Sequence, residues 1–249
     1  MASSLMNESR QSWQLQMRYR AGNHRNSQPN RMGYALCANA KVIYHPAPKN
    51  AGSSMRQHLF RIDNGRFYEP MVINGLRFEL YMIYGKPTCF EPVAELKGFE
   101  RMTVVRDPIS RFLSAYTNKV LDPHWRNPKN AQHCELLGLP LEPGLETFIE
   151  NLNAYQDIPA IAHHIRGQRF YLGDDLSYYD KVFRFEELDS AIEWINTRAG
   201  LVLEFPRLKT DGPKLRKQDI SSLAVRRLTD FLQDVYELLG GLYGPPSSP

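Results

Sequence analysis

An α/β fold with a central parallel sheet flanked by helices is predicted for this chain of 249 residues. Three short runs rich in β-branched and aromatic residues, near residues 41–45, 101–105 and 180–185, have the composition of buried strands. Helical patterns separate these runs, and strands joined through helices are typically parallel neighbours in one sheet. Ligands of such sheets bind beyond the carboxyl ends of the strands. Polar residues directly after each run are therefore the first candidates for a functional site.

The first run ends in a polar loop that contains a glycine. Residues 44–54 read Tyr-His-Pro-Ala-Pro-Lys-Asn-Ala-Gly-Ser-Ser, and a helical pattern with Met55 and Leu59 four residues apart follows them. A loop at a helix N-terminus attracts an anion through unpaired N–H groups and the helix dipole. The glycine lets the backbone approach the anion. The alternative to a phosphate site is an ordinary basic turn before a helix. The predicted phosphate-binding residues are Lys49, Asn50, Ala51, Gly52, Ser53 and Ser54.

The second run is followed by Arg106, Asp107 and Pro108 and then by a helical pattern. Asp107 is a suitable N-cap and Pro108 suits the first helical position, so Arg106 is left at the end of the strand, beyond the sheet edge. Ser114 follows two helical turns later on the side of Asp107. We therefore expect Arg106 and Ser114 to bind one ligand. For Arg111, the spacing favours an ion pair with Asp107.

Both loops resemble the donor-binding motifs of sulfotransferases. The sequence Pro-Lys-x-x-Gly-Ser-Ser, here residues 48–54, is similar to the loop that binds the 5′-phosphosulfate end of the sulfate donor, 3′-phosphoadenosine-5′-phosphosulfate (PAPS). Arg-Asp-Pro with a serine eight residues after the arginine resembles the segment that binds the donor's 3′-phosphate. A Walker loop, in contrast, has its lysine directly after the second glycine, whereas here the lysine precedes the glycine.

Two later segments resemble the carbohydrate sulfotransferase group known as sulfotransferase family 2. Residues 164–168, His-Ile-Arg-Gly-Gln, are similar to the group's His-Trp-Arg-Pro-Gln element and depart from it at Ile165 and Gly167. Residues 179–188 resemble its Tyr-Asp-x-Val-x-x-x-Glu-x-Leu segment, with Glu187 at the matching glutamate. Four motifs in the family's order imply a sulfotransferase fold, which is related to that of the P-loop NTPases.

The resemblance implies an enzyme that transfers a sulfuryl group from PAPS to a hydroxyl of a carbohydrate or a sugar-containing metabolite. The product nucleotide is 3′,5′-adenosine bisphosphate (PAP). Lys49 corresponds to the residue at the leaving phosphate oxygen. Ser53 and Ser54 correspond to the 5′-phosphate site, and Arg106 and Ser114 to the 3′-phosphate site. Two alternatives stay open: a non-catalytic nucleotide- or glycan-binding protein of the same fold, and a kinase-like phosphotransferase, which the loop order disfavours.

Several side chains are candidates for the base that removes the proton of the acceptor hydroxyl. His164 has a suitable intrinsic pKa and matches the histidine of the family element, so we predict that it has this role. Glu69, Glu79 and Glu91 are the alternatives, because related enzymes often supply a base from this variable stretch. The stretch does not identify the acceptor, a small molecule or an oligosaccharide.

Composition and charge limit the kinds of ligand. A formal net charge of +4, from 31 basic and 27 acidic residues, fits a small polyanionic ligand and requires no nucleic-acid partner. The cysteines Cys37, Cys89 and Cys134 are odd in number and widely spaced, which suits a reducing compartment. They lack the spacing of metal ligands, so we expect no metal.

The chain is expected to contain one sulfotransferase domain, residues 41–240, between a polar and partly disordered segment, residues 1–40, and a flexible tail, residues 241–249. The first segment has no apolar stretch of membrane-spanning length. Golgi relatives of the resembling group carry an anchor there, so we expect either a cytoplasmic, bacterial enzyme or a shortened chain, and the cysteine usage favours the former. The oligomeric state is not indicated.

Overall fold

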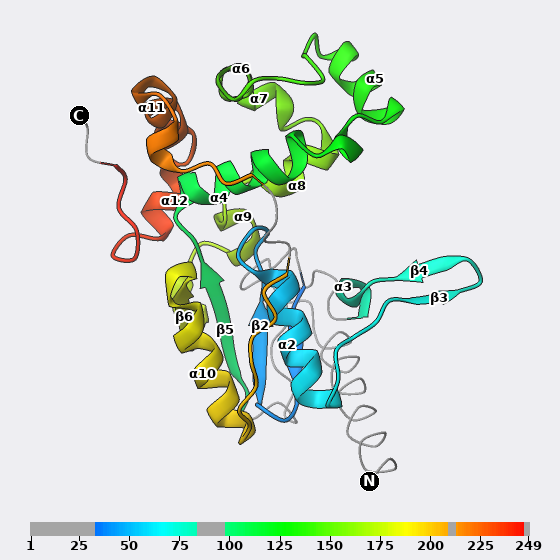
Figure 1. Cartoon of the computed structure of the whole chain (residues 1–249). Coiled ribbons are helices and arrows are strands. Elements are labelled where there is room, and N and C mark those ends of the chain that lie inside the picture. The colour runs from blue at the N-terminus through cyan, green and yellow to red at the C-terminus, as the bar shows by residue number, and fades with distance from the viewer. Residues whose placement is uncertain (1–32, 84–97, 209–212, 247–249) are drawn as a thin grey trace. The chain divides into compact units, whose positions relative to one another are not determined.

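The computed structural model describes residues 33–83, 98–208 and 213–246, which form two compact units (Figure 1). The sheet unit consists of the described residues of Met1–Val105 and Phe170–Leu208. The helical unit consists of the described residues of Arg106–Arg169 and Lys209–Pro249. Each unit has its own secondary structure and its own buried side chains.

A four-stranded sheet with the order β1-β2-β5-β6 organises the sheet unit. Its strands are β1 (Ala35–Cys37), β2 (Val42–His45), β5 (Glu100–Val105) and β6 (Lys181–Arg184). Strand β2 is parallel to β5, and β5 is parallel to β6, which confirms the three predicted strands and their direction. Strand β1 is antiparallel to β2 and adds an edge strand beyond the three predicted ones.

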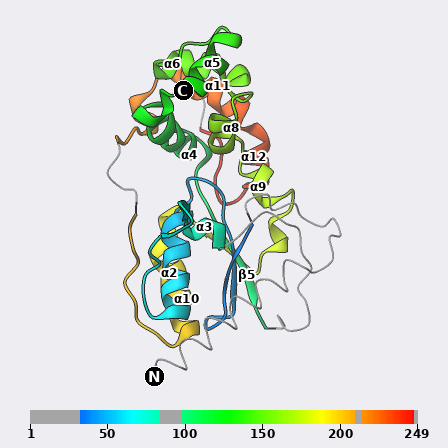
Figure 2. The same cartoon turned by 90° about the vertical axis from the view of Figure 1, so that its right-hand side faces the viewer.

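Helices α2 (Gly52–Asn64) and α10 (Leu188–Ala199) pack on the same face of this sheet (Figure 2). Apolar side chains three or four residues apart bring one side of each helix into the core. These side chains are Met55, Leu59 and Ile62 on α2, and Ala191, Ile192 and Ile195 on α10. Each helix ends at a glycine in the left-handed conformation, Gly65 and Gly200, which is the usual way to stop a helix.

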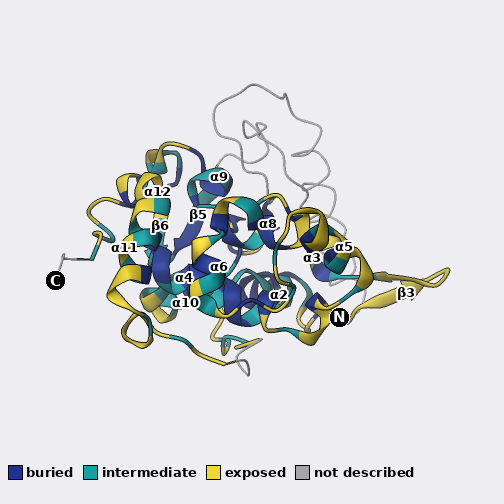
Figure 3. Ribbon diagram, turned by 90° about the horizontal axis from the view of Figure 1, so that it is seen from above, coloured by how far each residue is buried: buried dark blue, intermediate teal, exposed yellow. Residues whose placement is uncertain are grey.

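A two-stranded hairpin of β3 (Met71–Ile73) and β4 (Leu76–Phe78) belongs to the same unit, and helix α3 (Leu80–Ile83) follows it. Its turn residues Asn74 and Gly75 both have positive φ, 51° and 76°, as a type I′ hairpin turn requires. Strand β3 is exposed along its length (Figure 3).

The helical unit begins with α4 (Pro108–Ala115), which continues as the π-helix η2 (Tyr116–Val120). The remaining elements are η3 (Pro123–Trp125), α5 (Pro128–Leu136), α6 (Leu145–Glu150), α7 (Leu152–Tyr155), α8 (Pro159–Ile165), η6 (Lys217–Asp219), α11 (Ser222–Phe231) and α12 (Gln233–Leu238). The short helix α9 (Arg169–Leu172) and the turns η4 (Leu176–Tyr178) and η5 (Phe185–Glu187) connect α8 to the strand β6 and to α10.

Aromatic packing around Phe148 forms the centre of the helical unit. Its ring centroid lies 5.8 Å from that of Phe112, 5.4 Å from that of Tyr116 and 4.6 Å from that of Tyr155. The C-terminal segment forms two helices, α11 and α12, because Leu232 between them leaves the helical conformation, with φ −107° and ψ 14°. Its side chain is buried, so the break serves core packing.

A buried histidine gives the sheet unit a predictable response to acid. His45 ends β2, and its ring lies 5.7 Å from that of Tyr178 and 5.4 Å from that of Tyr179. Burial, assisted by the charge of Arg101, lowers the pKa of His45 from 6.5 to about 3. Between these two values the unfolded chain binds a proton that the folded protein excludes, so His45 makes folding less stable as the pH falls through this window.

We expect His45 to contribute about 1.4 kcal/mol per pH unit to the acid loss of stability between roughly pH 6 and pH 4. The test is urea unfolding of the wild type and His45→Phe across this range, with the slope of the unfolding free energy against pH as the readout. The slope should be shallower in His45→Phe. His124, whose side chain is 95% exposed, supplies the control variant His124→Gln. Equal slopes for wild type and His45→Phe would refute the assignment.

Candidate functional site

The loop between β2 and α2 has a backbone suited to binding an anion. Lys49 and Ala51 have φ values of 70° and 58°, in the left-handed region that residues with a Cβ rarely adopt. Asn50 between them has a negative φ, and such alternation directs successive N–H groups into one concave anion site. Ala51 is also the N-cap of α2 and has no side-chain acceptor to offer the first N–H groups of the helix.

Asn50 anchors this loop to the neighbouring strand. Its side chain is fully buried, and its Nδ2 donates a 2.7 Å hydrogen bond to the carbonyl of Val104 on β5. The hydroxyl of Tyr44 donates to the Asn50 carbonyl at 3.4 Å. The side chain of Asn50 therefore holds the loop in shape, and its backbone N–H donates a 3.4 Å hydrogen bond to the carbonyl of Ala47.

The two serines at the start of α2 differ in their surroundings. Ser53 is half-buried, whereas Ser54 is buried and its Oγ accepts a 3.0 Å hydrogen bond from the N–H of Leu208. Accepting this bond does not use the hydroxyl proton of Ser54. The segment that ends at Leu208 runs beside α2 (Figure 1) and is tied to the first turn of that helix. The side chain of Lys49 is half-buried.

Arg106 is the first residue of the helical unit, and its backbone is held from both sides by Gln168. The Arg106 N–H donates to Gln168 Oε1 at 3.0 Å, and Gln168 Nε2 donates to the Arg106 carbonyl at 2.6 Å. The side chain of Gln168 is fully buried. Asp107 accepts a 2.8 Å bond from the N–H of Ser110, and Pro108 begins α4, which confirms the predicted helix start.

The segment around Gln168 also holds helix α4. Arg111 is buried, and its Nη1 donates a 2.8 Å hydrogen bond to the carbonyl of Arg166, whereas the helical spacing suggested Asp107 as its partner. Ser114 lies on α4 and is half-buried. In the sequence, Gln168 is distinguished only as the last residue of the family-like element 164–168. Its role depends on a contact with Arg106, which is 62 positions away in the chain, and no local sequence pattern predicts such a contact.

Gly167 explains why this chain departs from the proline of the family element. A Cβ at this position would lie 2.5 Å from Cγ2 of Val235 on α12, which is closer than real Cβ contacts allow. A larger residue at this position therefore requires Val235 or α12 to shift.

We expect Gly167→Ala to lower the free energy of unfolding by about 1–3 kcal/mol, the usual cost of overpacking. Denaturant unfolding measures this change. The second substitution Val235→Ala should recover part of the loss in the double variant, because it removes the clashing methyl group. Gly144→Ala is the matched control, since nothing lies within 4 Å of a Cβ there. A Gly167→Ala variant as stable as Gly144→Ala would contradict the packing argument.

His164 lies in the last turn of α8, half-buried, with its ring centroid 4.9 Å from that of the exposed His163. The alternative bases have different surroundings. Glu69 is exposed, and Glu79 pairs with Arg77 through a 2.7 Å contact between Oε1 and Nε. Glu91 lies outside the described residues.

The family-like segment 179–188 supports the sheet. The buried Tyr179 hydroxyl donates to the Leu172 carbonyl at 2.9 Å. Glu187 accepts from the backbone N–H of Arg184 at 3.1 Å and from its Nε at 2.9 Å. These bonds lower the pKa of Glu187 and connect the end of β6 to the start of α10. We therefore interpret Glu187 as a capping residue.

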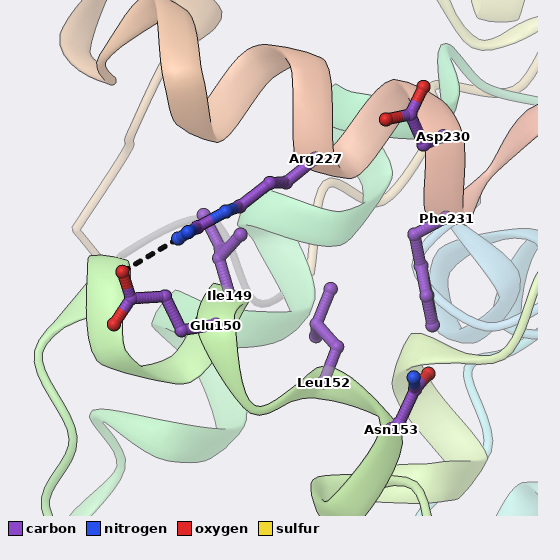
Figure 4. A pocket seen from close by; sticks show the side chains of 7 residues that line it. All are labelled: Ile149, Glu150, Leu152, Asn153, Arg227, Asp230 and Phe231. Atoms are coloured by element: carbon purple, nitrogen blue, oxygen red, sulfur yellow. Dashed lines mark hydrogen bonds and ion pairs between the residues drawn. The ribbon is translucent and has the colours of Figure 1, made fainter.

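A shallow pocket of the helical unit lies between α6, α7 and α11 (Figure 4). The ion pair of Arg227 and Glu150, with 2.6 Å between Nη1 and Oε1, spans one end of it. None of the predicted site residues lines this pocket, whose walls are Ile149, Glu150, Leu152, Asn153, Arg227, Asp230 and Phe231.

Within the ranges that the structure describes, no group of three or more His, Cys, Asp or Glu side chains is arranged to hold a metal ion. No helix in the same ranges combines the length and the apolar character needed to cross a bilayer. Cys37 and Cys134 are buried free thiols, and Cys37 Sγ donates to Asp63 at 3.2 Å. Cys89 lies outside the described residues.

Comparison with known proteins adds one finding to this geometry. A model of the sulfotransferase family matches residues 33–238. The match includes both loops and the two later segments, and it confirms the resemblance to family 2. No curated protein and no solved structure matches the chain. Because the family match covers most of the sequence, the chain belongs to the sulfotransferase family.

Proposed function

We propose that this sulfotransferase moves the sulfuryl group of PAPS to a hydroxyl of a carbohydrate or a sugar-containing metabolite. The observation that carries the proposal is the loop before α2, where Lys49 and Ala51 keep left-handed backbones beside a helix N-terminus that its own cap leaves open. Strained backbone of this kind is kept where a ligand needs it. The parallel strands β2 and β5 end at the same edge of the sheet, and Arg106 directly follows β5, which supports assigning the two motifs to one nucleotide.

Each residue has a defined role in the proposed reaction. The acceptor oxygen forms a bond to sulfur while the bond from sulfur to the 5′-phosphate oxygen breaks, so negative charge grows on that oxygen. The ammonium of Lys49 neutralises this charge, and the loop N–H groups with Ser53 and Ser54 hold the 5′-phosphate.

The other two motifs complete the proposed reaction. Arg106 and Ser114 bind the 3′-phosphate, for which the planar guanidinium gives a bidentate grip. The proton of the acceptor hydroxyl passes to His164. The products are the sulfated acceptor and PAP.

An acceptor screen tests the proposal. The full chain is incubated with PAPS and a panel of monosaccharides, oligosaccharides and sugar-bearing metabolites, and mass spectrometry follows both PAP and the sulfated product. We expect PAP to form only with an acceptor present and without added magnesium. Tight PAP binding with no transfer across the panel would favour a non-catalytic binding protein. Phosphorylation from ATP with magnesium would favour a kinase-like enzyme.

Arg106→Ala is expected to weaken PAP binding by ~1.5–3 kcal/mol, the range for a charge-assisted hydrogen bond. Binding of adenosine 5′-phosphate, which lacks the 3′-phosphate, should change little. Titration calorimetry with both nucleotides measures the difference. Arg226→Ala, at an exposed arginine of α11, is the charge-matched control. Equal losses for the two nucleotides would remove Arg106 from the 3′-phosphate site.

Gln168→Leu extends this test to the positioning of Arg106. The leucine fills a similar volume but cannot form hydrogen bonds with the Arg106 backbone. The preference for PAP over adenosine 5′-phosphate should therefore fall, though by less than in Arg106→Ala. Unchanged selectivity in a folded Gln168→Leu protein would show that the two bonds to Gln168 are not needed for binding.

A further inference from the structure

Helix α2 has a buried arginine in its second turn, directly beneath the anion loop. Arg56 is only 6% exposed. Its Nη1 donates to the carbonyl of Gly52 over 3.3 Å, and a Cβ at Gly52 would lie 3.3 Å from the same nitrogen. The guanidinium therefore lies against the point where the loop turns into the helix. Gly52 has no side chain that would separate the guanidinium from the loop.

The charge of Arg56 is poorly compensated by its surroundings. Nε has no hydrogen-bond partner, and among the described residues no carboxylate pairs with the guanidinium. Burial lowers the pKa of Arg56, and the nearby phenol of Tyr44 opposes this only in part. The positive end of the α2 dipole disfavours a cation here as well. A buried charge without a partner is costly, so its retention calls for an anion.

The contact with Gly52 gives little reason for an arginine at this position. The bond is long, and its acceptor is a carbonyl within the same helix, which bonds to the backbone without help from side chains. An apolar residue of similar length, such as methionine, would suit a purely structural position near Tyr44.

We propose that Arg56 is a second cation of the anion loop, which pairs with the 5′-phosphate of the bound nucleotide from the side of the helix while Lys49 acts from within the loop. The identity of the nucleotide rests on the proposed function, whereas the anion site at Arg56 rests on the burial and contacts of Arg56 itself. Ligand binding then supplies the negative charge that the ligand-free protein lacks. Arg56 is thus retained for binding at the expense of stability.

The test compares Arg56→Met with Arg61→Met. Arg61 lies on the same helix, over the ring of Phe67, and its replacement removes the same charge. Without ligand, Arg56→Met should unfold at the same temperature as the wild type or above it, because an uncompensated buried charge is removed. Its affinity for PAP should fall about 10–100-fold, as expected for a charge-assisted contact. Affinity for adenosine 3′-phosphate, which lacks the 5′-phosphate, should stay unchanged, and Arg61→Met should keep both affinities.

Arg56→Gln guards against a folding defect, because its amide can still donate to the Gly52 carbonyl. It should lose PAP affinity as Arg56→Met does. A large fall in melting temperature of both variants with PAP affinity within twofold of wild type would overturn the proposal and make Arg56 structural.

Inorganic pyrophosphate separates this inference from the donor assignment. If the wild type binds no PAP, the donor assignment fails. Arg56 is then still supported if pyrophosphate raises the melting temperature of the wild type and of Arg61→Met but not that of Arg56→Met or Arg56→Gln. The proposal is wrong if pyrophosphate stabilises all four proteins equally, or if neither pyrophosphate nor PAP stabilises the wild type.

Discussion

Lys49→Ala is expected to lower kcat by about 10²–10³-fold, the usual cost of losing one group that stabilises developing charge. In the proposed reaction the ammonium acts on charge that appears as the bond from sulfur to the 5′-phosphate oxygen breaks, so its loss should affect the transition state more than the ground state. PAP affinity should therefore fall far less than kcat. Initial rates at saturating PAPS, together with calorimetry of PAP, separate the two effects.

Lys41→Ala is a closely matched control for this variant. Lys41 is also a lysine of the sheet unit with positive φ, 52°, so both substitutions remove one charge from a left-handed position. Lys41 is exposed in the turn between β1 and β2. Its replacement should leave kcat unchanged. Turnover of Lys49→Ala within a few-fold of wild type would show that Lys49 only helps to bind the donor.

His164→Ala is expected to lower kcat by about 10²–10⁴-fold, the range for loss of a general base. The base must be neutral to accept the acceptor proton, so the wild-type rate should fall on the acidic side of the pH profile. That limb should vanish in the variant, because the titrating group is gone. The pH dependence of kcat from roughly pH 5 to 9 measures both effects.

His163→Ala is the neighbouring control, since its ring is exposed and lies 4.9 Å from that of His164. It should keep both kcat and the acidic limb. If His164→Ala changes KM or stability and the limb persists, His164 binds sugar or packs. The base is then sought with Glu69→Gln, Glu79→Gln and Glu91→Gln. Among these, Glu79 is paired with Arg77 in the structure.

Local signals explain why the main elements were predictable. Two adjacent residues predict the start of α4, because Asp107 caps the helix and Pro108 suits its first position. The three parallel strands are short runs of β-branched residues with helices between them. This alternation along the chain predicts a parallel sheet without any information on distant contacts. The same applies to the loop before α2, whose lysine, glycine and serines lie within residues 49–54.

Other features depend on contacts between distant residues. Strand β1 has only three residues, Ala35–Cys37, and follows a polar stretch, so its own sequence does not predict a strand. Its extended conformation depends on its pairing with β2. The break at Leu232 involves neither proline nor glycine. It comes from packing, which local propensity does not describe.

The site divides in the same way. By itself the sequence determined the strand-loop-helix order, the residues that are proposed to bind the two phosphates, and the family, because these are properties of neighbouring residues. Only the tertiary structure decided that Asn50 anchors its loop to β5, that Gln168 holds the backbone of Arg106, and that the charge of Arg56 faces inward. Helical spacing predicts that residue 56 lies on α2. Whether a charged side chain there is hydrated or buried depends on the segments that cover it, and these come from elsewhere in the chain.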